Sequence, residues 1–375
     1  MRSFIVNCVQ SALLKRDGQS AELVSQIEGS GAHQLADLLI QADLRGHYSH
    51  GVNRLDAYLG EIMSGVGSPS ITTGPVILKR KGATAWVDGT NGLGVVVGNY
   101  CTQLAVEMAK EFGIGWVVAK NSNHFGICAH YTLQMADLGL IGMAFTNTSP
   151  VVFPTGSAQK SLGTNPLSVV ANGKTDQFAL DMATSTVAFG KIEVANRNGQ
   201  PTIPNHWAAD SQGRATMQTE KVLNDGGLLP LGSVGKANEE GLETKDSSHK
   251  GTGLSMMVEL FCGILGQASY GKSVRKWRNF QDGSVANLGQ CFVAVDTECF
   301  APGFAERLQD FIKETHNLPP VDATIPVLVP GDPETMHSKL CNAAGGILYT
   351  IETVENLKKI GLEYNTEMFG WKKLL

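Results

Sequence analysis

The stretch ATAWVDGTNGLGVVVG, residues 83–98, decides between two kinds of fold. A short strand is expected over Ala83–Val87, and Gly92, Gly94 and Gly98 follow it, ahead of a predicted helix over Tyr100–Phe112. A Rossmann domain uses this order of elements to hold the pyrophosphate of a dinucleotide. The spacing differs here, because one residue too many stands before the last glycine.

The next strand also argues against a Rossmann unit. It is expected over Ile114–Ala119 and is followed by Lys120 and Asn121. A Rossmann unit has an acidic residue there, which binds the ribose. Close packing of a helix on a strand explains the glycines more simply. We therefore favour an α/β chain without a Rossmann unit.

On both sides of this stretch, apolar spacing predicts further helices and strands. The chain up to about Ile62 is expected to be helical, because apolar residues recur at helical spacing at Leu23, Ile27, Leu35, Leu38 and Leu39. Strands are then expected at Leu140–Thr146, Leu167–Val170, Phe178–Asp181 and Phe292–Val295. Helices are expected at Thr132–Leu138, Gly251–Gly266, Gly303–Thr315 and Thr353–Ile360.

Composition bounds the class of protein. The 375 residues are 42% hydrophobic and 17% charged, which is enough to bury a substantial core in two or three domains. The net charge of -5 argues against a nucleic-acid partner, and no apolar run reaches the length that spans a membrane. The 7 cysteines are widely spaced and contain no Cys-x-x-Cys pair. We therefore expect no disulfide framework, no metal site and a reducing compartment such as the cytoplasm.

The stretch DLRGHYSHGVNR, residues 43–54, holds a dense group of reactive side chains. His50 suits proton exchange with a hydroxyl or carbonyl oxygen near neutral pH. Arg54 offers a planar fork that matches a carboxylate. Their spacing of four residues puts both on one helical face if this turn is helical. A solvated, polar helix end is the competing interpretation.

Three further segments hold candidate binding residues, and each has an ordinary structural alternative. His124 follows a predicted buried strand, where α/β proteins often bind ligands, but it could equally hold a loop. Gly163–Leu167 and Asp181–Ser185 offer backbone N–H groups to an anion, but both could be plain turns. Lys250 and Gly251 open an apolar helix whose N-terminus would favour a phosphate, although a simple helix start is commoner.

Taken together, these segments resemble the malate/L-lactate dehydrogenase family, whose members lack a Rossmann fold. Relatives in that family include ureidoglycolate dehydrogenase, diketogulonate reductase and a piperideine-carboxylate reductase. The matching pieces run in the family's order across nearly the whole chain: Asp43–Arg54, Ser122–Gly126, Gly163–Leu167, Leu180–Ser185, Gly190-Lys191, Ile203–Trp207, Lys250–Leu254 and Pro330-Gly331. This collinearity is more specific than any single motif.

The resemblance implies roles for the matching residues. His50 corresponds to the catalytic proton donor, with Ser49 beside it as a relay that orients it. Arg54 corresponds to the ligand of the substrate carboxylate, and His124 and Thr164 to residues of the substrate pocket. Contacts to the nicotinamide cofactor are implied for seven positions: Thr148, Asp181, Met182, Ala183, Lys250, Gly251 and Gly331.

The resemblance also implies a fold, an assembly and a reaction. A mixed, mostly antiparallel sheet would form a cofactor domain over residues 76–304. Residues 1–75 and about 305–375 would form a helical domain that binds the substrate and contacts the second subunit of a homodimer. The reaction would move a hydride between NAD, or alternatively NADP, and a small 2-hydroxy or 2-keto acid. Malate is the first expectation for this carboxylate substrate, and lactate is the second.

Three alternatives stay open. A hydrolase could use Ser49 and His50, but adjacent side chains rarely point at one another and the chain has no Gly-x-Ser-x-Gly turn. A non-catalytic metabolite binder would explain the Gly-rich loops without a His–Arg pair. Within the oxidoreductases, a cyclic imine (piperideine-2-carboxylate) or ureidoglycolate oxidoreductase would use the same cofactor and proton donor.

Overall fold

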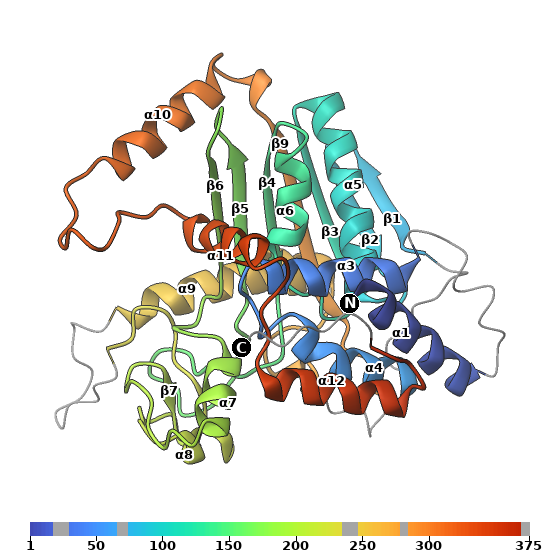
Figure 1. Ribbon diagram of the computed structural model, residues 1–375. Helices are drawn as coiled ribbons and strands as arrows, with labels where there is room; N and C mark the ends of the chain where they lie inside the picture. Colours follow the sequence, from blue (N-terminus) through green and yellow to red (C-terminus); the bar gives the residue numbers. More distant parts are fainter. Residues whose placement is uncertain (18–29, 66–73, 235–246, 278–283, 369–375) are drawn as a thin grey trace.

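A seven-stranded sheet forms the frame of the computed structural model, which describes residues 1–17, 30–65, 74–234, 247–277 and 284–368 (Figure 1). Its strands are β1 (Val76–Lys81), β2 (Thr84–Asp88), β3 (Ile114–Ser122), β4 (Leu140–Thr146), β5 (Leu167–Asn172), β6 (Gln177–Met182) and β9 (Leu288–Asp296). They stand in the order β1-β2-β3-β9-β4-β5-β6. Of these described strand pairs only β2 and β3 run parallel. The predicted mixed, mostly antiparallel sheet is confirmed, and the parallel sheet of a Rossmann unit is excluded.

The glycines of residues 92–98 serve close packing. A methyl group at Gly94 would lie 2.2 Å from the carbonyl oxygen of His124, and one at Gly98 would lie 2.4 Å from Cε1 of Tyr131. Helix α5 (Gly94–Phe112) therefore touches the loop after β3 and helix α6 (Ala129–Ala136). The close neighbours at these two glycines are thus a loop and a helix rather than the predicted strand. Both helices cover one face of the sheet (Figure 1).

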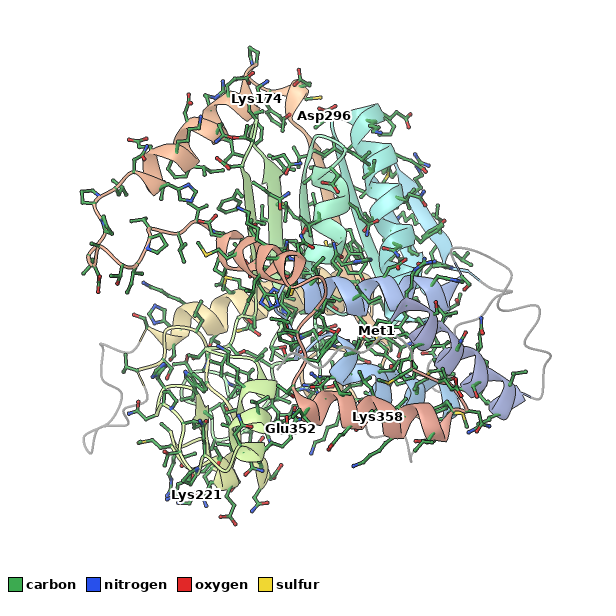
Figure 2. The ribbon with its side chains drawn as sticks, viewed as in Figure 1. Met1, Lys174, Lys221, Asp296, Glu352 and Lys358 are labelled. Atoms are coloured by element: carbon green, nitrogen blue, oxygen red, sulfur yellow. The ribbon has the colours of Figure 1, made fainter. Side chains whose placement is uncertain are left out.

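Helices from both ends of the chain share one hydrophobic core. They are α1 (Arg2–Asp17), α3 (Gly31–Leu44), α4 (Leu55–Met63) and α12 (Ile351–Glu363). Leu13, Leu35, Leu59 and Leu357 are buried together there, whereas Glu352 and Lys358 of α12 point outward (Figure 2). Leu23 and Ile27, which supported the helical prediction, lie outside the described residues.

A small lobe between β6 and α9 has a core of its own, which the sequence analysis did not predict. It contains α7 (Phe189–Arg197), β7 (Ala208–Ala209), α8 (Thr219–Leu223) and β8 (Gly227–Leu228). Ile192, Ile203, Val222 and Leu228 are buried in this core. Lys221 marks the outer end of the lobe in Figure 2.

The other face of the sheet is covered by α9 (Ser248–Glu259) and a π-helical turn over Leu260–Ile264. Val118 and Val293 pack against them, while the alternate residues Val117 and Phe292 pack against the α5–α6 layer. This alternation follows from the two-residue period of a strand. The described helices include none that is both long and apolar enough to span a membrane.

Two elements after β9 complete the described chain. Helix α10 (Phe304–His316) lies by the β5–β6 turn, where Thr175 donates its backbone N–H to Gln309 Oε1 at 2.8 Å. Helix α11 (Asp332–Ala343) begins after Gly331, whose φ of 102° suits glycine. Pro330 and Gly331 directly before α11 are typical of a turn, so the sequence did not predict this helix. Strand β1 was missed because all its residues are exposed and give no alternation.

Candidate active site

A cleft of about 1370 Å³ opens where the turn after α3, the ends of β3 and β6, and the small lobe meet. It brings together nine of the predicted site residues: Ser49, His50, Arg54, His124, Thr148, Thr164, Asp181, Met182 and Ala183. These residues come from well-separated parts of the sequence. The remaining three, Lys250, Gly251 and Gly331, do not line this cleft.

Ser49 and His50 are in direct contact. The distance between Ser49 Oγ and His50 Nδ1 is 2.9 Å, so the expectation that adjacent side chains point apart is wrong here. The contact occupies Nδ1 and leaves Nε2 of His50 for a ligand. The seryl hydroxyl thereby orients the imidazole, as the relay role requires.

The turn that carries His50 is anchored by the buried carboxylate side chain of Asp43. Asp43 Oδ2 accepts hydrogen bonds from the backbone N–H of Val52 at 3.0 Å and from the hydroxyl of Tyr349 at 2.7 Å. Burial raises the pKa of Asp43 to about 7. The first helical residue after the turn is Val52, in a 3-10 helix that ends at Arg54. The predicted common helical face of His50 and Arg54 is therefore wrong, and the turn itself brings both to the cleft.

Arg54 is held by two acceptors. Its Nε donates to the carbonyl oxygen of Ser49 at 2.6 Å, and its Nη2 donates to Glu193 Oε2 at 3.1 Å. The guanidinium carbon lies 5.8 Å from the ring centre of Trp277. The side chain of Arg54 is only 14% exposed, so its charge acts in a poorly solvated part of the cleft.

Burial strongly perturbs the two histidines of the cleft. The pKa of His50 is lowered to about 3, first by desolvation and then by the positive charges of Arg54 and His47. The pKa of His124 is lowered well below its ordinary value by desolvation, with smaller contributions from His50 and Arg54. Both imidazoles are therefore neutral at pH 7. The sequence analysis expected titration near neutrality, and the buried setting accounts for the difference.

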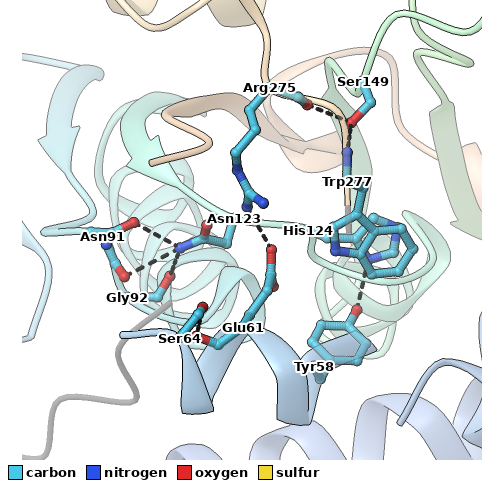
Figure 3. Close-up of polar contacts among 10 residues, drawn as sticks. All are labelled: Tyr58, Glu61, Ser64, Asn91, Gly92, Asn123, His124, Ser149, Arg275 and Trp277. Atoms are coloured by element: carbon cyan, nitrogen blue, oxygen red, sulfur yellow. Dashed lines mark hydrogen bonds and ion pairs between the residues drawn. The ribbon is translucent and has the colours of Figure 1, made fainter. Parts of the chain in front are cut away.

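Aromatic residues surround His124 (Figure 3). The indole of Trp277 stacks on its imidazole with ring centres 4.0 Å apart and an interplanar angle of 9°. The Tyr58 hydroxyl lies 2.7 Å from His124 Nδ1. The loop that carries His124 is held in place by Asn123, whose Nδ2 donates to the carbonyl oxygen of Gly92 at 2.8 Å. His124 is thus fixed in both position and orientation.

The segment that carries Trp277 is fixed by a buried ion pair (Figure 3). Arg275 Nη2 lies 2.9 Å from Glu61 Oε1, and the two side chains are 4% and 1% exposed. Ser149 Oγ donates to the carbonyl oxygen of Arg275 at 2.7 Å and accepts the backbone N–H of Trp277 at 2.8 Å. The sequence analysis missed Tyr58, Glu61, Arg275 and Trp277, because no motif marks them and Tyr58 lies within an apolar helix pattern.

The expected cofactor residues fall into two groups. Thr148, Asp181, Met182 and Ala183 line the cleft, where Thr148 Oγ1 lies 3.3 Å from the hydroxyl of Thr164. Asp181 Oδ2 already accepts the backbone N–H of Ala129 at 2.9 Å, and burial raises its pKa. The cleft exceeds the roughly 300–1,000 Å³ of common small-molecule sites. The volume therefore leaves room for a cofactor beside a small acid.

The second group does not line the cleft. Lys250 is exposed in the first turn of α9, and Gly251 is buried against the backbone of Leu231, which does line the cleft. Gly331 is buried against Ala179 of β6. The helix start at Lys250 thus shares a wall with the cleft but does not open into it.

The described residues contain no group of three or more His, Cys, Asp or Glu side chains that could hold a metal ion. All seven cysteines are described and free, and six of them are buried. Around His50 the cleft combines two neutral imidazoles, a seryl hydroxyl and a guanidinium. These groups suit proton transfer beside a bound carboxylate. A dehydrogenase site needs such groups, because its cofactor supplies the redox chemistry and the protein supplies proton transfer and orientation.

Comparison with known proteins agrees with this class. The family model for malate/L-lactate dehydrogenase matches residues 24–358. The malate dehydrogenase of Pyrococcus horikoshii is 43% identical over 284 residues, which are 75% of this chain and 74% of that protein. The L-sulfolactate dehydrogenase of Methanocaldococcus jannaschii is 34% identical over 80% of this chain and 81% of that protein. The crystal structure of malate dehydrogenase from Entamoeba histolytica superposes with a TM-score of 0.84 at 29% identity and covers 98% of both chains.

The chain belongs to the malate/L-lactate dehydrogenase family, as the resemblance of its motifs predicted. It is an oxidoreductase of 2-hydroxy acids that works with a nicotinamide cofactor. The hydrolase alternative is therefore excluded.

Proposed function

We propose that this protein is a malate dehydrogenase, with lactate as its second substrate and NAD as its cofactor, NADP being the alternative. The convergence of His50, Ser49 and Arg54 in one cleft supports this proposal most directly. The relative from Pyrococcus horikoshii, named a malate dehydrogenase, adds support for malate.

In the oxidation direction, Arg54 holds the substrate carboxylate, and His50 takes the hydroxyl proton. Nε2 is the accepting atom, because Nδ1 is in contact with Ser49 Oγ. The bound nicotinamide supplies the acceptor for the hydride. A pKa lowered to about 3 leaves His50 free to accept a proton without first losing one. An anionic substrate beside the ring raises that pKa again, which helps His50 to return the proton in the reduction direction.

The other predicted residues have supporting roles in this proposal. His124 and Thr164 shape the substrate side of the cleft, and Tyr58 and Trp277 hold His124 in place. Thr148, Asp181, Met182 and Ala183 would contact the nicotinamide end of the cofactor. Gly251 would act indirectly through Leu231, and Gly331 through its contact with Ala179, whereas Lys250 would meet the cofactor from the exposed start of α9.

We further propose a cytoplasmic homodimer with the two-domain division expected from the sequence. The outer face of α9 and of the π-helical turn after it supports the dimer, because Met256, Leu260 and Ile264 stand four residues apart and are 59%, 49% and 54% exposed. An apolar stripe of this kind is typical of a covered surface. Seven free cysteines support a reducing compartment.

A second substrate class is favoured by one relative. The 34% identical protein from Methanocaldococcus jannaschii is named an L-sulfolactate dehydrogenase, and a sulfonate could take the place of the second carboxylate of malate. Steady-state rates with malate, lactate, sulfolactate, ureidoglycolate and piperideine-2-carboxylate, each with NAD and NADP, test the proposal. The highest kcat/KM is expected for malate. A preference of more than tenfold for any other compound would replace malate in the proposal.

A further inference from the structure

The expected substrate ligand Arg54 already has an acidic partner within the protein. Arg54 Nη2 lies 3.1 Å from Glu193 Oε2, and the two side chains are 14% and 32% exposed. Arg54 Nε is committed to the carbonyl oxygen of Ser49 at 2.6 Å. A substrate carboxylate must therefore meet a guanidinium whose charge another carboxylate already balances.

Glu193 reaches this position from the small lobe. It lies on α7, three residues after Gly190, so the two residues share one face of the helix. A methyl group at Gly190 would lie 3.0 Å from Ser49 Cβ and 3.1 Å from Arg54 Nη2. The first turn of α7 thus lies directly against the turn that carries Ser49 and His50, which we call the catalytic turn. The absence of a side chain at Gly190 permits this approach.

The two carboxylates cannot share Arg54 without cost. Like charges that meet on one cation repel each other, and the low exposure of the pair limits screening by water. Glu193 is the more exposed partner. It is therefore the group that can turn toward solvent when another anion arrives, whereas Arg54 stays bonded to the Ser49 backbone.

We propose that Glu193 acts as the resting partner of Arg54 and sets the affinity for the substrate by competing with its carboxylate for Arg54. The inference rests on the proposed function, because it assigns the substrate carboxylate to Arg54. Glu193 lowers the affinity for every carboxylate, so that only acids that gain further contacts in the cleft displace it. Binding of the cofactor is outside this competition.

The test compares Glu193→Gln with Glu220→Gln. Both variants remove one negative charge from the same lobe, but Glu220 is exposed on α8 and is not a cleft residue. The probe is oxamate, a monocarboxylate that cannot be reduced, titrated by calorimetry into each protein loaded with NADH. We expect Glu193→Gln to bind oxamate about twofold to fivefold more tightly, the range that a partly exposed ion pair allows. Glu220→Gln should match the parent protein.

Kinetics provide a second readout. In Glu193→Gln, KM for the 2-keto acid should fall by a similar factor, kcat should stay within about twofold, and the affinity for NADH should not change. Glu193→Asp, which keeps the charge, should return oxamate binding toward the parent value. Unchanged or weaker oxamate binding in Glu193→Gln would overturn the inference and make Glu193 a residue that only positions Arg54. Failure of the proposed function would appear separately, as an unmodified protein that neither reduces the keto acids nor binds oxamate.

Discussion

The indole of Trp277 lies flat on the imidazole of His124, with ring centres 4.0 Å and ring planes 9° apart. These residues stand far apart in sequence, on the loop after β3 and on the segment before β9. Tyr58 completes the enclosure through its hydroxyl contact to His124 Nδ1 at 2.7 Å. The substrate side of the cleft is thus built around an immobilised imidazole.

Removal of the stacked ring should loosen His124. Trp277→Ala is expected to lower kcat/KM for the 2-hydroxy acid roughly tenfold, because an aromatic pair of this kind contributes about 1 kcal/mol beyond its buried area. Trp277→Phe keeps a stacking face and should lose about threefold or less. Equal losses in both variants would contradict a stacking role. The affinity for the cofactor, measured in parallel, should not change.

His50 is expected to carry the proton transfer. His50→Ala should lower kcat by about a hundred- to ten-thousand-fold, the usual contribution of general acid–base catalysis. Cofactor binding, measured by quenching of tryptophan fluorescence, should survive. His124→Ala serves as the comparison. Near-normal turnover in His50→Ala combined with a large loss in His124→Ala would transfer the proton-transfer role to His124.

Arg54 is expected to act on substrate binding through its planar fork. Arg54→Lys keeps the charge but loses the bidentate geometry and the bond to the carbonyl oxygen of Ser49. KM for the 2-keto acid should rise roughly tenfold, since a hydrogen bond between charged groups contributes about 1.5–3 kcal/mol. KM for the cofactor should not change. A normal KM for the keto acid in this variant would make Arg54 purely structural.

The pH dependence of stability should reveal the buried His130. Burial lowers its pKa from 6.5 to about 4, so the unfolded chain binds more protons than the folded one between these values. The contribution of the neutral, buried His130 to the free energy of unfolding is therefore complete above pH 6.5 and is lost as the pH falls toward 4. Urea unfolding at several pH values should show the free-energy gap between the parent protein and His130→Gln narrowing by about 2 kcal/mol from pH 7 to pH 4.5. A gap that is constant with pH would show that folding leaves the pKa of His130 unchanged.

Gly51 should be intolerant of any side chain. A methyl group there would lie 1.7 Å from Oδ1 of Asp43, the acid that anchors the catalytic turn. Gly51→Ala is expected to destabilise the protein by about 3 kcal/mol or more and to abolish most activity. Gly253→Ala is the matched control, since no atom lies within 4 Å of a methyl group on this exposed position of α9. It should raise the free energy of unfolding by up to about 1 kcal/mol.

The sheet type could be anticipated from the resemblance of the motifs to a known family, but the order of its strands could not. The misplaced glycine at position 98 and the missing acid after Ala119 argued locally against a Rossmann unit. Strand β9, in contrast, inserts between β3 and β4, although it follows the other described strands of the sheet in the chain. Such pairing depends on contacts between distant residues and leaves no local pattern.

The same limit applies to the cleft. His50, Arg54 and His124 stood out because polar, reactive residues cluster near helix and strand ends. Tyr58 is hidden among the apolar residues of α4, and Glu193 lies on a helix that the sequence analysis did not predict. Their roles arise from contacts that only the folded chain creates. Local patterns therefore identified the reactive groups and missed the residues that hold and regulate them.

The shared core of α1 and α12 has a consequence for synthesis of the protein. The ribosome makes α1 well before α12, the partner helix that shares its core, and before Tyr349, whose hydroxyl braces Asp43. Until then the nascent chain exposes an apolar surface, which invites aggregation. The turn that carries His50 can reach its final geometry only once those later residues have docked, so we expect no activity from a chain that stops before Tyr349.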